Sequence, residues 1–127
     1  PIGSTAGLDL IAGMTLPMIF NYFAVKIHGV NAAELELDLN LEIPDTGEKA
    51  VLRLSNGTLS HSLADREERA PTLEITRDLL NRLVANEVTL EAAIEAGELD
   101  PGPGLEAFRR IGEHLDEFDL WFPIIEP

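Results

Sequence analysis

Residues 34–43 read ELELDLNLEI, with leucine or isoleucine at every second position and an acidic or amide residue at each position between. Successive side chains of a β-strand point to opposite faces of the sheet. The segment is therefore predicted to be a strand with one apolar face and one solvated face. A sheet built from such strands needs cover on only one side.

The sequence PDTG at 44–47 predicts a turn directly after this strand. A turn there pairs Ile43 with Glu48, and this pairing brings Leu39 opposite Leu52. The apolar positions of the two strands then share one face, which supports the register.

Asn56-Gly57 predicts a second hairpin, because both central residues of a type I′ turn need a positive φ. In this register His61 lies opposite Leu52, on the apolar face. The two turn signals are independent of each other, yet they predict one consistent antiparallel meander of three strands.

Apolar residues recur at helical spacing before and after the meander. The first predicted helix has Thr15 as its N-cap, carries Pro17 in its first turn and ends near Gly29. Thr76 and Thr89 are the predicted N-caps of two shorter helices.

A last helix is predicted to begin near Pro103 or Gly104. Its apolar stripe consists of Leu105, Phe108, Ile111, Leu115 and Phe118. A short strand is predicted at 72–76, and a further strand at 98–104, where Pro101 interrupts the pattern.

These elements predict an α+β fold with a mainly antiparallel sheet of about five strands and helices over one face. The 127 residues have room for one domain. Residues 1–7 are small and polar, so we expect a linker or lead-in there and a single domain at 8–127.

The chain carries 23 acidic residues against nine Lys and Arg, and its formal net charge is -14. Nucleic acids and anionic lipid headgroups attract basic surfaces, so neither is an expected partner. There is no cysteine, which excludes disulfides and thiolate metal sites. No apolar run approaches the roughly 18 residues of a membrane span, so we expect a soluble protein.

Residues for catalysis are not apparent in this sequence. His28, His61 and His114 lie far apart and show none of the spacings of metal-ligand motifs. The four serines occur in no nucleophile elbow, and the glycines form no phosphate-binding loop. We expect no catalytic residue, no metal site and no cofactor in this chain.

Large apolar side chains are the remaining signal, with Phe20 and Phe23 on the first helix and Trp121 and Phe122 near the end. They are explained either by a solid core or by a gap between sheet and helices that forms a ligand pocket. His61 is either a core histidine with a satisfied hydrogen bond or a polar anchor inside that pocket.

Residues 14–29, MTLPMIFNYFAVKIHG, resemble the opening helix of the C-terminal domain of bacterial alkyl sulfatases. DTGEK at 45–49 and LSNGTLSH at 54–61 are similar to the hairpin turns of the same domain, and FDLWFPIIEP at 118–127 is similar to its ending. The resemblance covers about residues 8–127.

The resemblance implies a sterol carrier protein type-2-like fold, in which a mixed sheet and the helices over one face enclose a hydrophobic tunnel for acyl and alkyl chains. In the sulfatases this domain is accessory. Their chemistry belongs to an N-terminal metallo-β-lactamase-like domain with a histidine-rich dizinc site, and no HxHxDH motif occurs in this sequence.

The expected ligand is therefore the aliphatic chain of an amphiphile such as an alkyl sulfate or a fatty acid. The expected partner is an N-terminal metallo-β-lactamase-like domain, and the bacterial cytoplasm, the periplasm and secretion all stay open as compartments. The alternative is an interaction or scaffold domain with a solid core and no ligand cavity.

A cavity between sheet and helices would be lined by side chains of both layers. The candidate lining residues are Met14, Ile19, Phe20, Phe23, Leu52, His61, Leu83, Phe108, Trp121 and Phe122.

Overall fold

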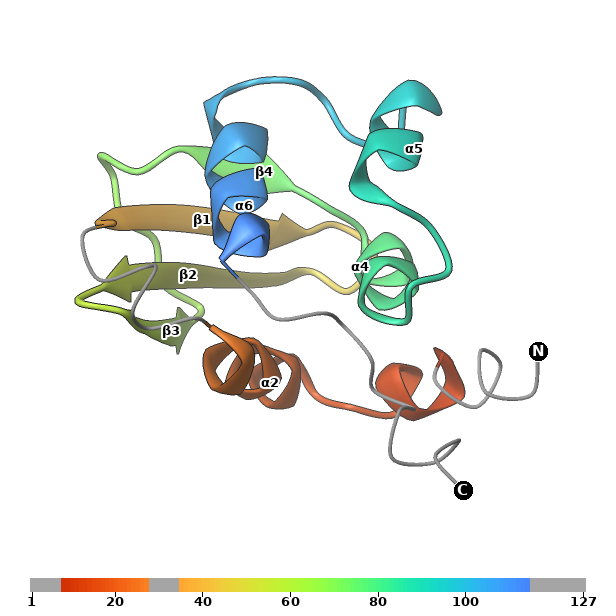
Figure 1. Ribbon diagram of the computed structural model, residues 1–127, viewed down its shortest axis with the longest axis horizontal. Helices are drawn as coiled ribbons and strands as arrows, with labels where there is room; N and C mark the ends of the chain where they lie inside the picture. Colours follow the sequence, from red (N-terminus) through yellow and green to blue (C-terminus); the bar gives the residue numbers. More distant parts are fainter. Residues whose placement is uncertain (1–7, 28–34, 115–127) are drawn as a thin grey trace.

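The computed structural model of the chain describes residues 8–27 and 35–114, which form an α+β fold (Figure 1). The strands are β1 (Leu37–Ile43), β2 (Glu48–Ser55), β3 (Thr58–Leu63) and β4 (Thr72–Glu74). The helices are α2 (Leu16–Lys26), α4 (Arg77–Val84), α5 (Leu90–Glu95) and α6 (Pro103–Glu113). The expectations for Gly29, Leu115, Phe118 and the lead-in at 1–7 lie outside the described residues.

The predicted meander is confirmed in its register. Strand β1 pairs antiparallel with β2 through Ile43 and Glu48 and through Leu39 and Leu52. Strand β2 pairs antiparallel with β3, and Leu52 faces His61. The turn residues adopt the positive φ that the sequence requires, 54° at Asn56 and 75° at the glycine that follows it.

Strand β4 pairs with β1 in parallel, through Leu41 and Leu73, and completes a mixed sheet with the order β3-β2-β1-β4. It is shorter than the predicted 72–76 strand because Thr76 acts as the N-cap of α4. The Thr76 hydroxyl accepts a hydrogen bond from the backbone N–H of Leu79 at 3.0 Å, which starts the helix.

The strand predicted at 98–104 does not form, so the described sheet has four strands instead of about five. Pro101 and Pro103 have no backbone N–H for a sheet ladder. Leu99 is buried as a single anchor, 2% exposed, and Pro103 becomes the first residue of α6.

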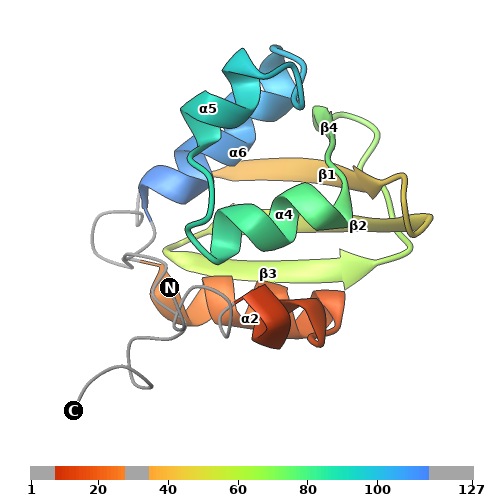
Figure 2. The same ribbon diagram turned by 90° about the vertical axis from the view of Figure 1, so that its right-hand side faces the viewer.

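Helices cover the apolar face of the sheet. Helix α2 lies along β3, helix α6 lies along β1 and β4, and α4 lies at a level between them in both views (Figures 1 and 2). Beneath them Leu39, Leu41 and Leu52 are at most 1% exposed. The helix caps predicted at Thr15 and Thr89 are confirmed, since each side chain accepts a hydrogen bond from a backbone N–H of its helix.

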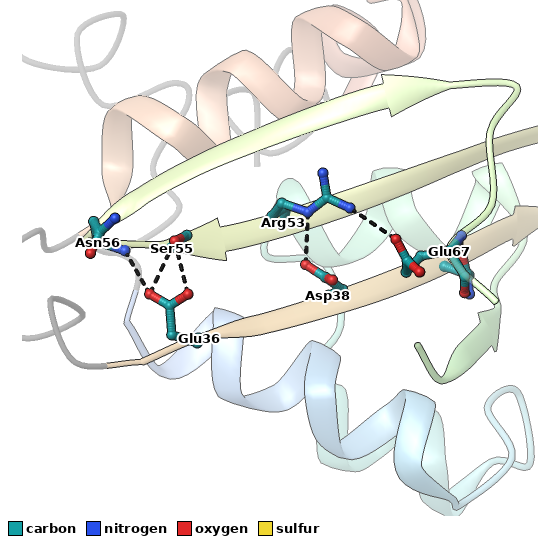
Figure 3. Close-up of polar contacts among 7 residues, drawn as sticks. Glu36, Asp38, Arg53, Ser55, Asn56 and Glu67 are labelled. Atoms are coloured by element: carbon teal, nitrogen blue, oxygen red, sulfur yellow. Dashed lines mark hydrogen bonds and ion pairs between the residues drawn. The ribbon is translucent and has the colours of Figure 1, made fainter. Parts of the chain in front are cut away.

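The opposite face of the sheet is polar, as the alternation predicts. On this face the Arg53 guanidinium lies between the Asp38 and Glu67 carboxylates, at 3.0 Å and 3.3 Å (Figure 3). The hydrogen bond with Asp38 raises the pKa of Arg53 above its ordinary value.

Asn40 is a buried polar residue on this same face, 2% exposed, and the loop 64–71 supplies the hydrogen-bond partners of its side chain. Its amide nitrogen donates to the carbonyls of Glu67 and Ala70 at 2.8 Å and 3.1 Å, and its oxygen accepts from the N–H of Glu67 at 2.8 Å. These bonds fasten the loop that connects the meander to β4.

Helix α6 approaches β4 so closely that only glycine fits at position 104. A Cβ atom at Gly104 would lie 2.2 Å from the carbonyl oxygen of Thr72. We predict that Gly104→Ala lowers the free energy of unfolding by about 2 kcal/mol, because α6 has to move off the strand. Urea denaturation followed by circular dichroism measures the effect.

Gly112 on the same helix provides the control, because a Cβ atom there would meet no atom within 4 Å among the described residues, the adjacent α6 backbone aside. Alanine has the higher helix propensity, so Gly112→Ala should leave stability unchanged or raise it by up to about 1 kcal/mol. Equal effects of the two substitutions would contradict the close approach at Thr72.

Asp45 joins the β1–β2 turn to the start of α4. Its carboxylate accepts from the backbone N–H groups of Arg77 at 2.7 Å and Asp78 at 3.3 Å. The bond from Arg77 is the main cause that lowers the pKa of Asp45 below its usual 3.8. The negative charge also lies at the positive end of the helix dipole.

A lowered pKa in the folded state contributes stability above pH 3.8 that is lost as the pH falls through the folded-state pKa. We predict that Asp45→Asn lowers the free energy of unfolding at neutral pH by about 0.5 kcal/mol, a small value because the group is exposed. The difference from wild type should shrink below pH 3.8. Thermal unfolding between pH 7 and pH 2.5 tests this, and a gap that stays constant would contradict it.

Candidate functional site

A half-open cavity of about 430 Å³ lies between helices α4, α5 and α6, and Phe23 of α2 also contributes to its lining. Its volume falls within the range of about 300–1,000 Å³ that is common for ligand pockets. The apolar lining residues are Phe23, Leu80, Leu83, Val84, Val88, Leu90, Phe108 and Ile111.

Helix α4 forms one wall through Leu80, Leu83 and Val84, which belong to its buried stripe. An ion pair between Arg82 and Glu98 fixes this helix against the segment that follows α5. The hydrogen bond that Arg82 donates to Glu98 raises the pKa of Arg82 above its ordinary value. This ion pair therefore holds α4, and with it this wall of the cavity, in place.

Arg77 holds the first turn of α4 against the N-terminal segment. Its guanidinium donates to the backbone carbonyls of Ile11 and Met14 and to the side chain of Asn81. Residues 8–12 are helical, and Ile11 is fully buried. These hydrogen bonds attach the segment before α2 to α4, the helix that lines the cavity.

Helix α5 closes the outer side. The Thr89 hydroxyl accepts from the N–H of Ala92 at 3.1 Å, and Ala93 is fully buried as the anchor of this six-residue helix. Val88 and Leu90 contribute apolar side chains to the cavity and are only partly buried. Half-buried aliphatic residues gain further burial when an apolar ligand covers them.

Helix α6 forms the third wall through Phe108, Ile111 and Gly112. Ile111 is 1% exposed and anchors the helix to the core, while Phe108 is only partly buried. Apart from the neighbouring backbone of α6, no atom of the described residues lies within 4 Å of a Cβ built on Gly112, so this position leaves space beside the cavity.

The structure brings three of the candidate lining residues together in this cavity: Phe23, Leu83 and Phe108. Three others are buried in the core beneath α2 with at most 1% exposure: Ile19, Phe20 and Leu52. Met14 packs against that core and is partly buried. Trp121 and Phe122 lie outside the described residues.

His61 lies beside the core and is not among the residues that line the cavity. Its ring centroid is 5.3 Å from that of Phe20, at an interplanar angle of 52°. The imidazole is partly buried at the boundary between β3 and α2, where it packs against an aromatic ring.

Sequence reasoning missed Val88, Leu90 and Arg109 as cavity residues. Leu90 directly follows the predicted N-cap Thr89, and one apolar residue at that position does not mark a cavity. Val88 lies in the short α4–α5 connection, and no periodic pattern marks it. Arg109 directly follows the apolar Phe108, and a basic residue there is typical of any solvated helix face.

A second hollow of about 900 Å³ is lined by β1, β2, the loop 64–71 and α6, and its lining includes residues of both sheet faces, such as Leu54 and Arg53. Its walls carry Arg53 with its two carboxylate partners (Figure 3), together with Arg69, Glu106 and Arg110. This hollow is larger, but it is more open to solvent, and half of its lining residues are charged, against three in the cavity between the helices. The cavity between the helices is therefore the better apolar site.

Neither hollow contains a cluster of metal-ligating side chains among the described residues. Within 8–27 and 35–114, no three His, Asp or Glu side chains come together in a way that could hold a metal ion. No helix in these two ranges is both long enough and apolar enough to cross a bilayer. The arrangement can bury apolar groups, with charged residues only at its rim.

Comparisons with known proteins agree with the fold. A family model described as alkyl sulfatase C-terminal matches residues 4–127. A linear primary-alkylsulfatase of Pseudomonas sp is 29% identical over 128 residues, which covers 100% of this chain and 19% of that protein. The chain thus spans about a fifth of the length of this relative.

Solved structures show the same arrangement. The stereoselective inverting sec-alkylsulfatase Pisa1 from Pseudomonas sp. matches with a TM-score of 0.76 and 24% identity over 86% of this chain and 17% of that chain. The UbiJ-SCP2 ubiquinone synthesis protein matches with a TM-score of 0.53 and 18% identity, covering 82% of this chain and 93% of that chain. The sterol-carrier-like fold that the sequence resemblance implied is confirmed.

Proposed function

Because this chain belongs to the alkyl sulfatase C-terminal family, we propose that it is a non-catalytic module that binds the aliphatic chain of an amphiphile such as an alkyl sulfate or a fatty acid. The apolar cavity between α4, α5 and α6 is the observation that carries the proposal. In this role the domain recruits the substrate tail for an N-terminal metallo-β-lactamase-like domain, in which the ester would be cleaved.

The energetics favour tail burial as the source of affinity. Each methylene group removed from water contributes about 0.8 kcal/mol, which corresponds to about a three- to fourfold gain in affinity. Leu83, Val88 and Phe108 offer walls without charge to such a chain. The entropic costs of association and of ordering the chain reduce the total binding free energy, but the gain for each added carbon remains.

The surface charge of the domain suits an anionic amphiphile only if the head group stays outside. With a formal charge of -14, the surface repels anions at long range. A head group at the open side of the cavity is accessible to a separate catalytic domain. Binding by the tail therefore keeps the ester outside the apolar walls.

The proposal predicts a chain-length dependence for alkyl sulfates from hexyl to dodecyl, measured by titration calorimetry below their micellar concentrations. Affinity should rise about threefold per carbon until the cavity is filled, and then level off. Circular dichroism on the same samples confirms that the protein stays folded. Affinity that does not change with chain length would refute tail burial.

Gly112→Phe offers a matched test within the fold. The added ring should occupy the open space beside Ile111 and lower the affinity for decyl sulfate about tenfold or more, because it removes room for several methylene groups. Arg110→Phe is the control, since Arg110 is an exposed residue of the same helix that does not line the cavity. Equal affinities of the two variants would place the ligand elsewhere.

A second candidate function is an interaction module, and the outer face of α2 favours it. Met18 and Val25 are 50% and 80% exposed there, and α2 contains no acidic residue. An apolar helix face of this kind suits contact with another part of a longer polypeptide. This candidate gains support if decyl sulfate binds neither the wild type nor the Gly112→Phe variant.

A further inference from the structure

Arg109 is the one Lys or Arg side chain among the described residues that line the apolar cavity. It lies on α6, next to Phe108, and its side chain is 35% exposed. A side chain in this position reaches the cavity with its aliphatic stem and the solvent with its guanidinium. It therefore lies where the tail and the head group of a bound amphiphile would meet.

The Arg109 guanidinium is poorly satisfied by the protein. Its Nη1 atom is 4.0 Å from the Glu91 carboxylate and its Nε atom is 3.6 Å from the Glu106 carboxylate, and both distances are too long for hydrogen bonds. Nε is buried and has no hydrogen-bond partner among the described residues. A buried donor without an acceptor costs free energy.

Other arginines of the domain are arranged differently. Arg53 and Arg82 each place Nε 3.0 Å from an aspartate oxygen and use a second nitrogen for another carboxylate. Arg77 donates to two backbone carbonyls and an amide. Compared with these three, Arg109 makes no hydrogen bond with the described residues, and its two Nη groups, which are not buried, remain available to a ligand.

We propose that Arg109 binds the anionic head group, a sulfate ester or a carboxylate, of the amphiphile whose tail lies in the cavity. This inference rests on the proposed function, because the tail brings the head group to the guanidinium. The planar array of donors on arginine matches two oxygens of such an anion. The side chain of Glu91 is 70% exposed, so it can rotate away from Arg109 toward the solvent when the anion binds.

The carboxylates at the rim set the limits of this site. Glu91 and Glu113 line the cavity beside Arg109, and Glu106 lies one turn earlier on the helix. An anion without an apolar tail would meet mainly repulsion from these groups. We therefore expect the site to have little affinity for free sulfate and to bind a molecule that has both an apolar tail and an anionic head group.

The inference also bears on turnover in a sulfatase. An alkyl sulfate carries one negative charge, and the alcohol that remains after the ester is hydrolysed carries none. Arg109 would thus hold the ester more tightly than the alcohol of the same chain length. The domain would retain substrate and release product without any change in the apolar walls.

The test compares decyl sulfate with decan-1-ol and decyltrimethylammonium by titration calorimetry on wild type and on Arg109→Gln. Wild type should bind decyl sulfate more tightly than decanol. Arg109→Gln should weaken decyl sulfate binding about fivefold and leave decanol unchanged, a loss typical of one partly exposed charged hydrogen bond. Arg110→Gln removes the same charge from an exposed neighbouring residue and should bind all three ligands as wild type does.

Two further variants separate head-group binding from a structural role. Arg109→Lys keeps the charge and should recover part of the loss, while Glu91→Gln removes a competing carboxylate and should strengthen decyl sulfate binding about twofold or more. If Arg109→Gln weakens decanol as much as decyl sulfate, or weakens neither, the inference is wrong and tail burial stands. If none of the three ligands binds wild type, the proposed function itself fails, and the inference fails with it.

Discussion

The division of β1 into an apolar and a polar face is the constraint from which the rest of the structure follows. Leu39 and Leu41 must be removed from water on one side, while Asp38 must remain near it on the other. A single layer of helices meets both demands. That layer consists of separate helices, which are anchored at different places on the sheet. Neighbouring helices therefore do not have to pack against each other along their whole lengths. The cavity lies where α4, α5 and α6 leave such a gap.

Much of the fold could be predicted because its signals are local. The two hairpin turns set the register by themselves, and three threonine caps mark the helix starts at Thr15, Thr76 and Thr89. The fifth strand was a wrong prediction, although Pro101 already argued against it. The parallel pairing of β4 with β1 has no local signature, because it depends on a loop that is held by the side chain of Asn40.

The candidate site was harder to predict than the fold. Apolar residues that fill the core and those that line a gap have the same periodicity, so Phe20 and Phe23 cannot be told apart from sequence. The difference arises from the spacing between helices, which is a tertiary property. Residues such as Val88 in a connection and Arg109 beside an aromatic residue become visible only when three helices meet.

The parallel β1–β4 pair has a consequence for the way this chain assembles. Contacts within the meander are local along the chain, whereas the β1–β4 pair joins strands separated by the rest of the meander and by the loop 64–71 that is bonded to Asn40, and such non-local contacts are slower to form. Helices α4 and α6 are attached to β4 through Thr76 and Gly104. The hollow between them therefore depends on the parallel β1–β4 pairing, and the meander by itself contains none of the residues that line it.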